Sequence, residues 1–143
     1  DGGAAAGFEG ILSPDVLVPL WDKFTMLVPL ANVNALTRAP LGKYRADPDS
    51  WSLVEGSVHE TVAVGRAEGV NLAPDAADKA IALIRSMPDH HMTSMGNDLL
   101  RGNRLELPWF AGKVVELGRK HGVPTQVNSF VYAALKLYAN GPP

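Results

Sequence analysis

The sequence contains no cysteine among its 143 residues. Disulfide bonds, cysteine-ligated zinc sites and thiol catalysis are therefore excluded, and this absence is typical of proteins from a reducing compartment. An excess of charge is also missing, because 13 lysines and arginines stand against 15 aspartates and glutamates. A formal net charge of −2 does not indicate the basic patch that nucleic-acid-binding proteins usually carry, so we expect no nucleic-acid partner.

A clean membrane-spanning run is absent as well. The longest apolar stretch, residues 17–36, is interrupted by Asp22, Lys23 and Pro29, whereas a membrane helix needs about 20 consecutive apolar residues. No basic segment precedes an apolar core at the start of the sequence, as a secretory signal would require. We therefore expect a cytoplasmic protein without a membrane partner.

Glycine and alanine dominate residues 1–10, which we interpret as a linker or the frayed edge of a domain. A dinucleotide-binding glycine loop needs a strand before it and a helix after it. We expect no strand before these glycines, and we therefore do not expect them to bind phosphate.

Strand signals are weak in the rest of the sequence, and helix signals are strong. With 46% hydrophobic and 20% charged residues in the chain, residues 11–143 are expected to form one ordered domain. Prolines and glycines mark helix starts and ends, and apolar residues recur at helical spacing. The sequence predicts an all-α domain of about six helices, near residues 14–38, 48–68, 75–87, 93–100, 108–121 and 125–138.

Local features add detail to this prediction. Ser13 and Thr125 are expected to cap the first and last helices, and Pro29 is expected to kink or break the first one. Phe130 and Tyr138 lie at helical spacing on the apolar face of the last helix. We predict both aromatic residues to be part of the core.

Lys23 is the first candidate for chemistry, because it lies within a long apolar helical stretch. Partial burial of an ammonium group favours its neutral form, so a lysine in such a place gives up its proton more readily near neutral pH. The alternative is an ordinary lysine that extends to water beside Asp22. The pattern alone favours this alternative, because most lysines remain solvated.

A second candidate is the segment 94–106, which is dense in short polar side chains. Ser94 and Asp98 are four residues apart and would share a helix face, and Glu106 lies just before the next helix. A short capped helix with solvated charges would show the same pattern. The adjacent histidines 90 and 91 would point in different directions, so we expect no metal site.

Six segments follow one another in a characteristic order. They are Trp21–Phe24, Asn34–Gly42, Ser94–Met95 with Asp98, Arg104 and Glu106, Gly112–Gly118, Gly122–Thr125 with Asn128, and Leu135–Lys136. No single segment is specific, but their order resembles the C-terminal domain of the ketopantoate reductases (2-dehydropantoate 2-reductases). The resemblance extends from about Phe8 to Tyr138, and it implies a helical domain like that of 6-phosphogluconate dehydrogenase-type reductases.

The resemblance implies an NADPH-dependent reductase that converts 2-dehydropantoate to pantoate on the route to coenzyme A. In that family an N-terminal Rossmann domain holds the cofactor, and the helical domain closes over the substrate. By this resemblance Lys23 is the general acid and Glu106 is a catalytic glutamate that organises the lysine and the ligands. Ser94 is a substrate-binding residue, and Asp98 supports it from the same helix face.

Two positions depart from the family pattern. Members of the family carry asparagines four and eight residues after the lysine, and this sequence has Leu27 and Ala31 there. Asn34, eleven residues after Lys23, is expected to lie roughly on the same face and to supply a substitute amide for the substrate. The two aliphatic residues leave a different 2-oxo acid open as the substrate.

Three functions therefore remain open. The first is the catalytic half of a 2-dehydropantoate reductase, and the second is a paralogue that reduces another 2-oxo acid or an imine. The third is a helical dimerisation module without catalysis. For an enzyme, we expect Lys23, Ser94 and Glu106 to converge on an open face where a Rossmann domain docks, and we expect no activity from the 143 residues alone. That exposed face would also favour a homodimer.

Overall fold

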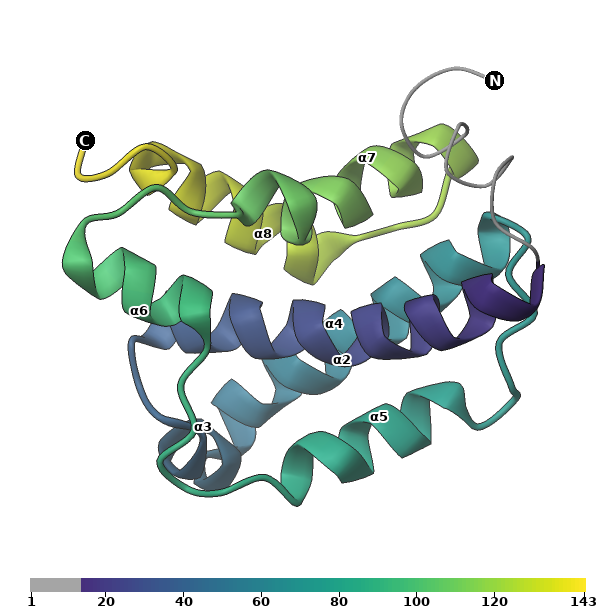
Figure 1. The fold of residues 1–143 in the computed structure, drawn as a ribbon, viewed down its shortest axis with the longest axis horizontal. Helices are drawn as coiled ribbons and strands as arrows, with labels where there is room; N and C mark the ends of the chain where they lie inside the picture. Colours follow the sequence, from purple (N-terminus) through teal and green to yellow (C-terminus); the bar gives the residue numbers. More distant parts are fainter. Residues whose placement is uncertain (1–13) are drawn as a thin grey trace.

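The computed structural model describes residues 14–143, and it confirms an all-α fold (Figure 1). These residues contain no β-sheet, and only one isolated bridge joins Ala139 to Gly141. The predicted linker at residues 1–10 and the predicted cap at Ser13 lie outside the described residues. The helices are α2 (Pro14–Thr37), α3 (Leu41–Ala46), α4 (Pro48–Ala67), α5 (Ala76–Arg85), α6 (Ser94–Arg101), α7 (Ala111–His121) and α8 (Gln126–Leu135), with 3-10 turns η1 (Leu107–Trp109) and η2 (Lys136–Tyr138).

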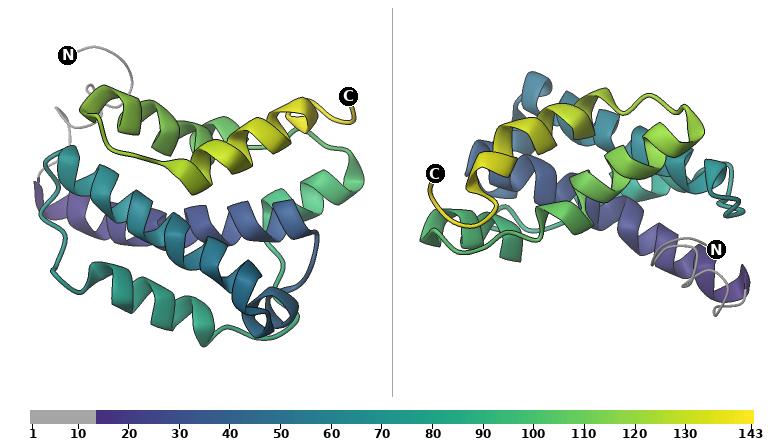
Figure 2. Two further views of the ribbon diagram at one scale, coloured as in Figure 1. Left: turned by 180° about the vertical axis from the view of Figure 1, so that it is seen from behind. Right: turned by 90° about the horizontal axis from the view of Figure 1, so that it is seen from above.

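Helix α2 lies at the centre of the domain. It crosses α4, with α7 and α8 on one side and α5 on the other, and α6 contacts its C-terminal half (Figures 1 and 2). Each of the three hydrophobic clusters of the described residues includes a part of α2: Leu30 contributes to one, Ala31 to the second and Val28 to the third. The burial of this one helix from several directions therefore organises the core.

The central position of α2 also accounts for its apolar composition. Residues 16–37 form the one described helix that is long and apolar enough to cross a membrane by length and composition. In this structure, however, the helix buries polar as well as apolar groups against its neighbours, and Asn32 and Asn34 are both fully buried. The buried apolar residues of its C-terminal half, such as Val28 and Leu30, therefore belong to the core, whereas Val16 and Leu20 near its start are exposed.

Pro29 does not break the first helix, because α2 is continuous from Pro14 to Thr37. Proline removes one backbone donor from a helix and normally destabilises it. Here Pro29 is buried between Val28 and Leu30, which pack into two different clusters. Packing on both sides of the proline holds the two halves of α2 in one helix.

A short helix, α3, was not predicted. Its buried residues Leu41 and Tyr44 lie three positions apart and face the core. Two backbone N–H groups at its start donate to the segment before α6, Leu41 N to His91 O at 3.1 Å and Gly42 N to Asp89 O at 2.8 Å. These bonds join segments that are distant in sequence. The local pattern of prolines and glycines therefore could not predict this helix.

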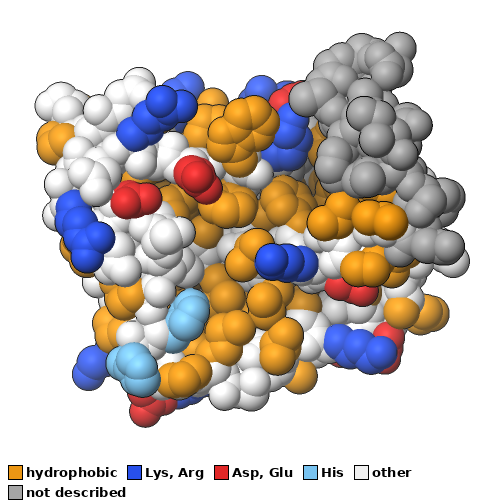
Figure 3. Space-filling view, viewed as in Figure 1, with side chains coloured by type: hydrophobic (Ala, Val, Ile, Leu, Met, Phe, Trp, Pro, Cys, Tyr) orange, Lys and Arg blue, Asp and Glu red, His pale blue; other side chains and the backbone are white. Residues whose placement is uncertain are grey.

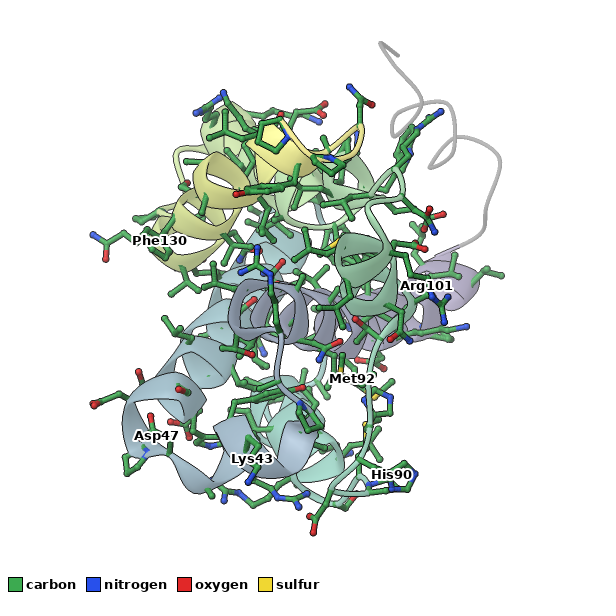
Figure 4. The ribbon with its side chains drawn as sticks, turned by 90° about the vertical axis from the view of Figure 1, so that its left-hand side faces the viewer. Lys43, Asp47, His90, Met92, Arg101 and Phe130 are labelled. Carbon is green, nitrogen blue, oxygen red and sulfur yellow. The ribbon has the colours of Figure 1, made fainter. Side chains whose placement is uncertain are left out.

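The last helix differs from the prediction in its cap and its buried face. The Thr125 side chain makes no capping bond. Instead the Glu60 carboxylate, on α4, accepts bonds from Val127 N at 2.8 Å and Asn128 N at 3.0 Å. The prediction of Phe130 as core is wrong, because its side chain is 60% exposed while Val131 beside it is fully buried. In Figure 4, Phe130 projects away from the domain on the side opposite His90.

Candidate functional site

A cavity of about 290 Å³ opens between α2, the segment before α6 and the start of α7. Its walls are mostly apolar, and its polar members are His91, Thr93 and Ser94. The apolar lining residues are Met26, Leu27, Leu30, Ala31, Met87, Met92, Met95 and Phe110. In Figure 3, hydrophobic side chains form a broad band across this face of the molecule, with charged groups and histidines around it.

Lys23 lies on α2 one turn before Leu27, a lining residue of the cavity. Residues four apart share a helix face, and helical side chains lean toward the N-terminus, so Leu27 covers the surface next to Lys23. The lysine side chain is exposed, and no hydrogen bond or ion pair joins it to the side chains described for residues 16–143. The expected partial burial of its ammonium group is therefore not found in this structure.

Ser94 is the first residue of α6 and lies on the wall of the same cavity. The preceding residue, Thr93, caps the helix, because its hydroxyl accepts from Gly96 N at 2.9 Å. The exposed Ser94 hydroxyl is not used as the cap and is available at the surface of the cavity. Ser94 thus lines the apolar cavity, and Lys23 lies one helical turn before Leu27 on its α2 wall.

Glu106 lies in a second, neighbouring hollow of about 380 Å³. Asp98 and Arg104 line the same hollow, which is more polar than the first. Asp98 therefore does not share the cavity of Ser94, although both are on α6. Trp109 lines this second hollow, and the next residue, Phe110, lines the first cavity and packs against Phe24 of α2 with 6.5 Å between ring centroids.

Asn34 does not face the cavity, contrary to the expectation of a substrate-facing amide. Its side chain is fully buried. The amide nitrogen donates to Ala39 O at 2.8 Å, and the oxygen accepts from Thr93 N at 2.7 Å and Thr93 Oγ1 at 2.8 Å. A Cβ at Gly96 would overlap this oxygen, so α6 approaches closely here. Asn34 therefore ties the C-terminal end of α2 to the start of α6.

The histidines do not form a metal centre in the described part of the chain, where no group of three histidine, aspartate or glutamate side chains converges. His91 lines the cavity, and its buried Nδ1 has no hydrogen-bond partner. His90 points outward at the turn after α5, while Met92 lies next to α2 (Figure 4).

The family model described as "Ketopantoate reductase PanE/ApbA C terminal" matches residues 15–139. The chain belongs to this family. A 2-dehydropantoate 2-reductase from Caulobacter vibrioides is 34% identical over 125 residues, which are 87% of this chain and 42% of that protein. One from Mycobacterium tuberculosis is 31% identical over 150 residues, covering 99% of this chain and 50% of that protein. The chain thus spans about half the length of the curated relatives it matches.

Solved structures show the same helical fold. A PanE/ApbA family ketopantoate reductase from Ralstonia eutropha JMP134 is 29% identical, with a TM-score of 0.76 over 85% of this chain and 41% of that one. A dimeric ketopantoate reductase from Staphylococcus aureus has a TM-score of 0.82 at 21% identity, over 97% of this chain and 52% of that one. A D-mandelate dehydrogenase, 19% identical with a TM-score of 0.76 over 87% of this chain and 43% of that one, shares the fold.

Sequence reasoning missed the cavity itself. The chain has four methionines, and all of them, Met26, Met87, Met92 and Met95, line this one cavity. Met26 is far from the other three in sequence, so no local pattern could bring them together. A set of polar side chains was missed for the same reason, namely the buried Asn32, Ser57 and Asn128 and the half-buried Glu60 that bonds Asn128.

Proposed function

We propose that this ketopantoate-reductase-family domain is the substrate-binding and catalytic half of an NADPH-dependent reductase of 2-oxo acids, with 2-dehydropantoate as its reference substrate. One observation carries the proposal: Ser94 lines an apolar cavity whose α2 wall begins within one turn of the exposed Lys23. The two residues come from distant parts of the chain, and neither is used to hold the fold. The 2-dehydropantoate 2-reductases among the relatives supply the reaction class.

Reduction of a 2-oxo acid places negative charge on the carbonyl oxygen. An ammonium group near that oxygen stabilises the charge and then donates a proton to it, which is the role proposed for Lys23 Nζ. The Ser94 hydroxyl would bond the carboxylate or the keto oxygen of the acid. Glu106, in the neighbouring polar hollow with Arg104, would help to organise the lysine when the cleft closes.

Residues 14–143 do not themselves fit a dinucleotide, because they contain no sheet and no strand–glycine-loop–helix unit. NADPH would supply the hydride from a Rossmann domain in another part of the protein, which is the proposed partner of the open face. The described residues would bind the acid, orient it and hold the proton at Lys23 Nζ. The cytoplasm is the proposed location, and a homodimer is a further proposed assembly.

The test is NADPH oxidation with 2-dehydropantoate by the full-length protein and its Lys23→Ala variant. We expect kcat to fall by about 100-fold or more, as for loss of a general acid, while stability changes by less than about 0.5 kcal/mol because Lys23 is exposed. Lys43→Ala, at another exposed lysine on α3, is the matched control and should retain full activity. Equal activity of the Lys23→Ala variant and the wild type would exclude the proposed role of Lys23.

The 143 residues alone should bind no NADPH and show no turnover. A full-length protein that binds NADPH but reduces no 2-oxo acid would instead favour a non-catalytic helical module.

A further inference from the structure

The cavity beside Lys23 has a composition that bears on the substrate. Of its eleven lining residues, eight are apolar and four of these are methionines. Methionine is unbranched and polarisable, so it adapts to ligands of different shape and makes favourable contacts with aromatic rings. An apolar cavity of about 150 Å³ is large enough to hold benzene. With about 290 Å³, this cavity has room for a branched aliphatic or aryl group.

The polar groups of the cavity lie in one region of its wall. His91, Thr93 and Ser94 are close in sequence, in the segment that leads into α6. The Thr93 hydroxyl is already engaged, because it donates to Asn34 Oδ1 at 2.8 Å and accepts from Gly96 N at 2.9 Å. Ser94 and His91 therefore remain as the polar side chains of the lining that could bond a ligand.

The α2 wall of the cavity offers no polar partner at all. It consists of Met26, Leu27, Leu30 and Ala31, directly beyond Lys23 on the helix. A hydroxyl group placed against this wall would lose its bonds to water without gaining a new one, which costs free energy. A methyl or phenyl group in the same place would gain from burial.

We propose that this cavity binds the side chain of the substrate, and that it selects 2-oxo acids with an apolar, branched or aryl side chain over those that carry a hydroxyl. Leu27 is the main residue that sets this preference, because it lines the cavity one turn after Lys23 on the same face of α2. This inference rests on the proposed reductase function and specifies the substrate class of the same site.

Two acids that differ by one hydroxyl test the inference in the full-length protein. These are 2-dehydropantoate and 3,3-dimethyl-2-oxobutanoate, in which the hydroxymethyl group is replaced by methyl. We expect kcat/KM for the apolar acid to equal or exceed that for 2-dehydropantoate. A site built to bond the hydroxyl would reject the analogue by orders of magnitude. A preference of tenfold or more for 2-dehydropantoate would therefore overturn the inference, whichever residue made the bond.

A Leu27→Asn variant adds a polar partner to the α2 wall. Leu27 is half-buried, so the variant is expected to fold. We expect the ratio of the two kcat/KM values to move toward 2-dehydropantoate by about tenfold. Leu137→Asn makes the same change at a leucine that is 64% exposed and outside the cavity, and it should leave the ratio unchanged. An unchanged ratio in the Leu27→Asn variant would remove Leu27 from the proposal.

A binding measurement separates failure of the inference from failure of the proposed function. In protein labelled with ¹³C at the methionine methyl groups, the signals of Met26, Met87, Met92 and Met95 should shift when 3,3-dimethyl-2-oxobutanoate is added. Shifts without turnover of either acid would support the cavity and contradict the reductase function. Turnover of 2-dehydropantoate with no methionine shift on addition of the apolar acid would support the function and overturn the inference.

Discussion

The two sides of α2 differ in the environment of their polar side chains. On the side that faces α4 and α8, Asn32 donates to Ser57 Oγ at 3.0 Å and to Asn128 Oδ1 at 2.8 Å, and all three residues are fully buried. On the open side, Lys23 is exposed without a partner in the described chain, and the neighbouring wall is apolar. One helix therefore carries both the polar centre of the fold and the edge of the candidate site.

This difference shows which polar groups are available for chemistry. A buried amide must find partners, because an unsatisfied donor or acceptor costs about 1–3 kcal/mol. The Asn32 amide nitrogen is therefore committed to holding helices together, whereas its buried Oδ1 has no partner in the described chain. Lys23 and Ser94 remain solvated at no such cost, and their bonding capacity is free for a ligand.

Among the predicted substitutions, replacement of Glu60 should lower the free energy of unfolding most. Its carboxylate accepts from Val127 N, Asn128 N and Asn128 Nδ2, at 2.8, 3.0 and 2.9 Å. Replacing Glu60 by alanine removes the cap of α8 and an acceptor for a buried amide, so we expect a loss of about 3 kcal/mol in the free energy of unfolding. Glu60→Gln keeps an acceptor and should lose less. Urea denaturation gives both values.

His59→Ala, at the adjacent exposed residue, is the control for the Glu60 variants and should change stability by less than about 0.5 kcal/mol. If Glu60→Ala were as stable as this control, the carboxylate would not be the cap of α8, and the contrast between the two sides of α2 would fail.

Asn34 provides a second test of the comparison, because its helical spacing from Lys23 suggested a ligand-binding amide, whereas the structure shows it buried and bonded to the start of α6. Asn34→Ala should lower the free energy of unfolding by about 2 kcal/mol, since the N–H of Thr93 loses its acceptor. KM for the 2-oxo acid should change by less than about twofold. Asn103→Ala, at an exposed asparagine, is the control. A tenfold rise in KM with unchanged stability would return Asn34 to the ligand site.

Most of the fold could be predicted from the sequence, because prolines, glycines and apolar spacing act locally. Helices α2, α4 and α6 begin and end within a few residues of the predicted positions. The predictions that were wrong concerned residues whose environment is set by contacts with parts of the chain far away in sequence. Phe130 has the spacing of a core residue, but α8 turns Val131 and Leu135 toward the core and leaves Phe130 exposed. Threonine is a common N-cap residue, but at the start of α8 the Glu60 side chain from α4 takes the place of the Thr125 side chain as the acceptor.

The candidate site was predictable only in part. Lys23 and Ser94 were identified through the family order of motifs; Ser94 lines the cavity, and Lys23 is exposed on α2 one turn before the lining residue Leu27. The substitute amide at Asn34 was inferred from the helical period alone. That period gives the direction of a side chain but not which helix packs against it, so the contact with Gly96 and Thr93 could not be foreseen.

Replacement of Asp47 should change the stability of the protein least. The Asp47 carboxylate is exposed but has a hydrogen-bond partner. It accepts from Ser50 N at 2.8 Å and caps α4. This bond lowers the pKa of Asp47 below its ordinary value of 3.8. The folded form therefore binds the proton less readily than the unfolded form. The stabilisation is present above the unfolded pKa and is lost as pH falls through the lower, folded pKa.

The Asp47→Ala variant should consequently be slightly less stable than the wild type at pH 5, and the difference should shrink as pH falls below about 3.8. Asp47→Asn keeps a neutral acceptor, so its stability should vary less with pH than that of the wild type. Urea denaturation at pH 5 and at about pH 3 measures both trends. A difference between Asp47→Ala and the wild type that grows toward low pH would contradict the assignment, because it would require a raised pKa in the folded state. Kinetic constants of the full-length protein should be the same in all three forms, since Asp47 lies at the start of α4, away from the lining of the cavity beside Lys23.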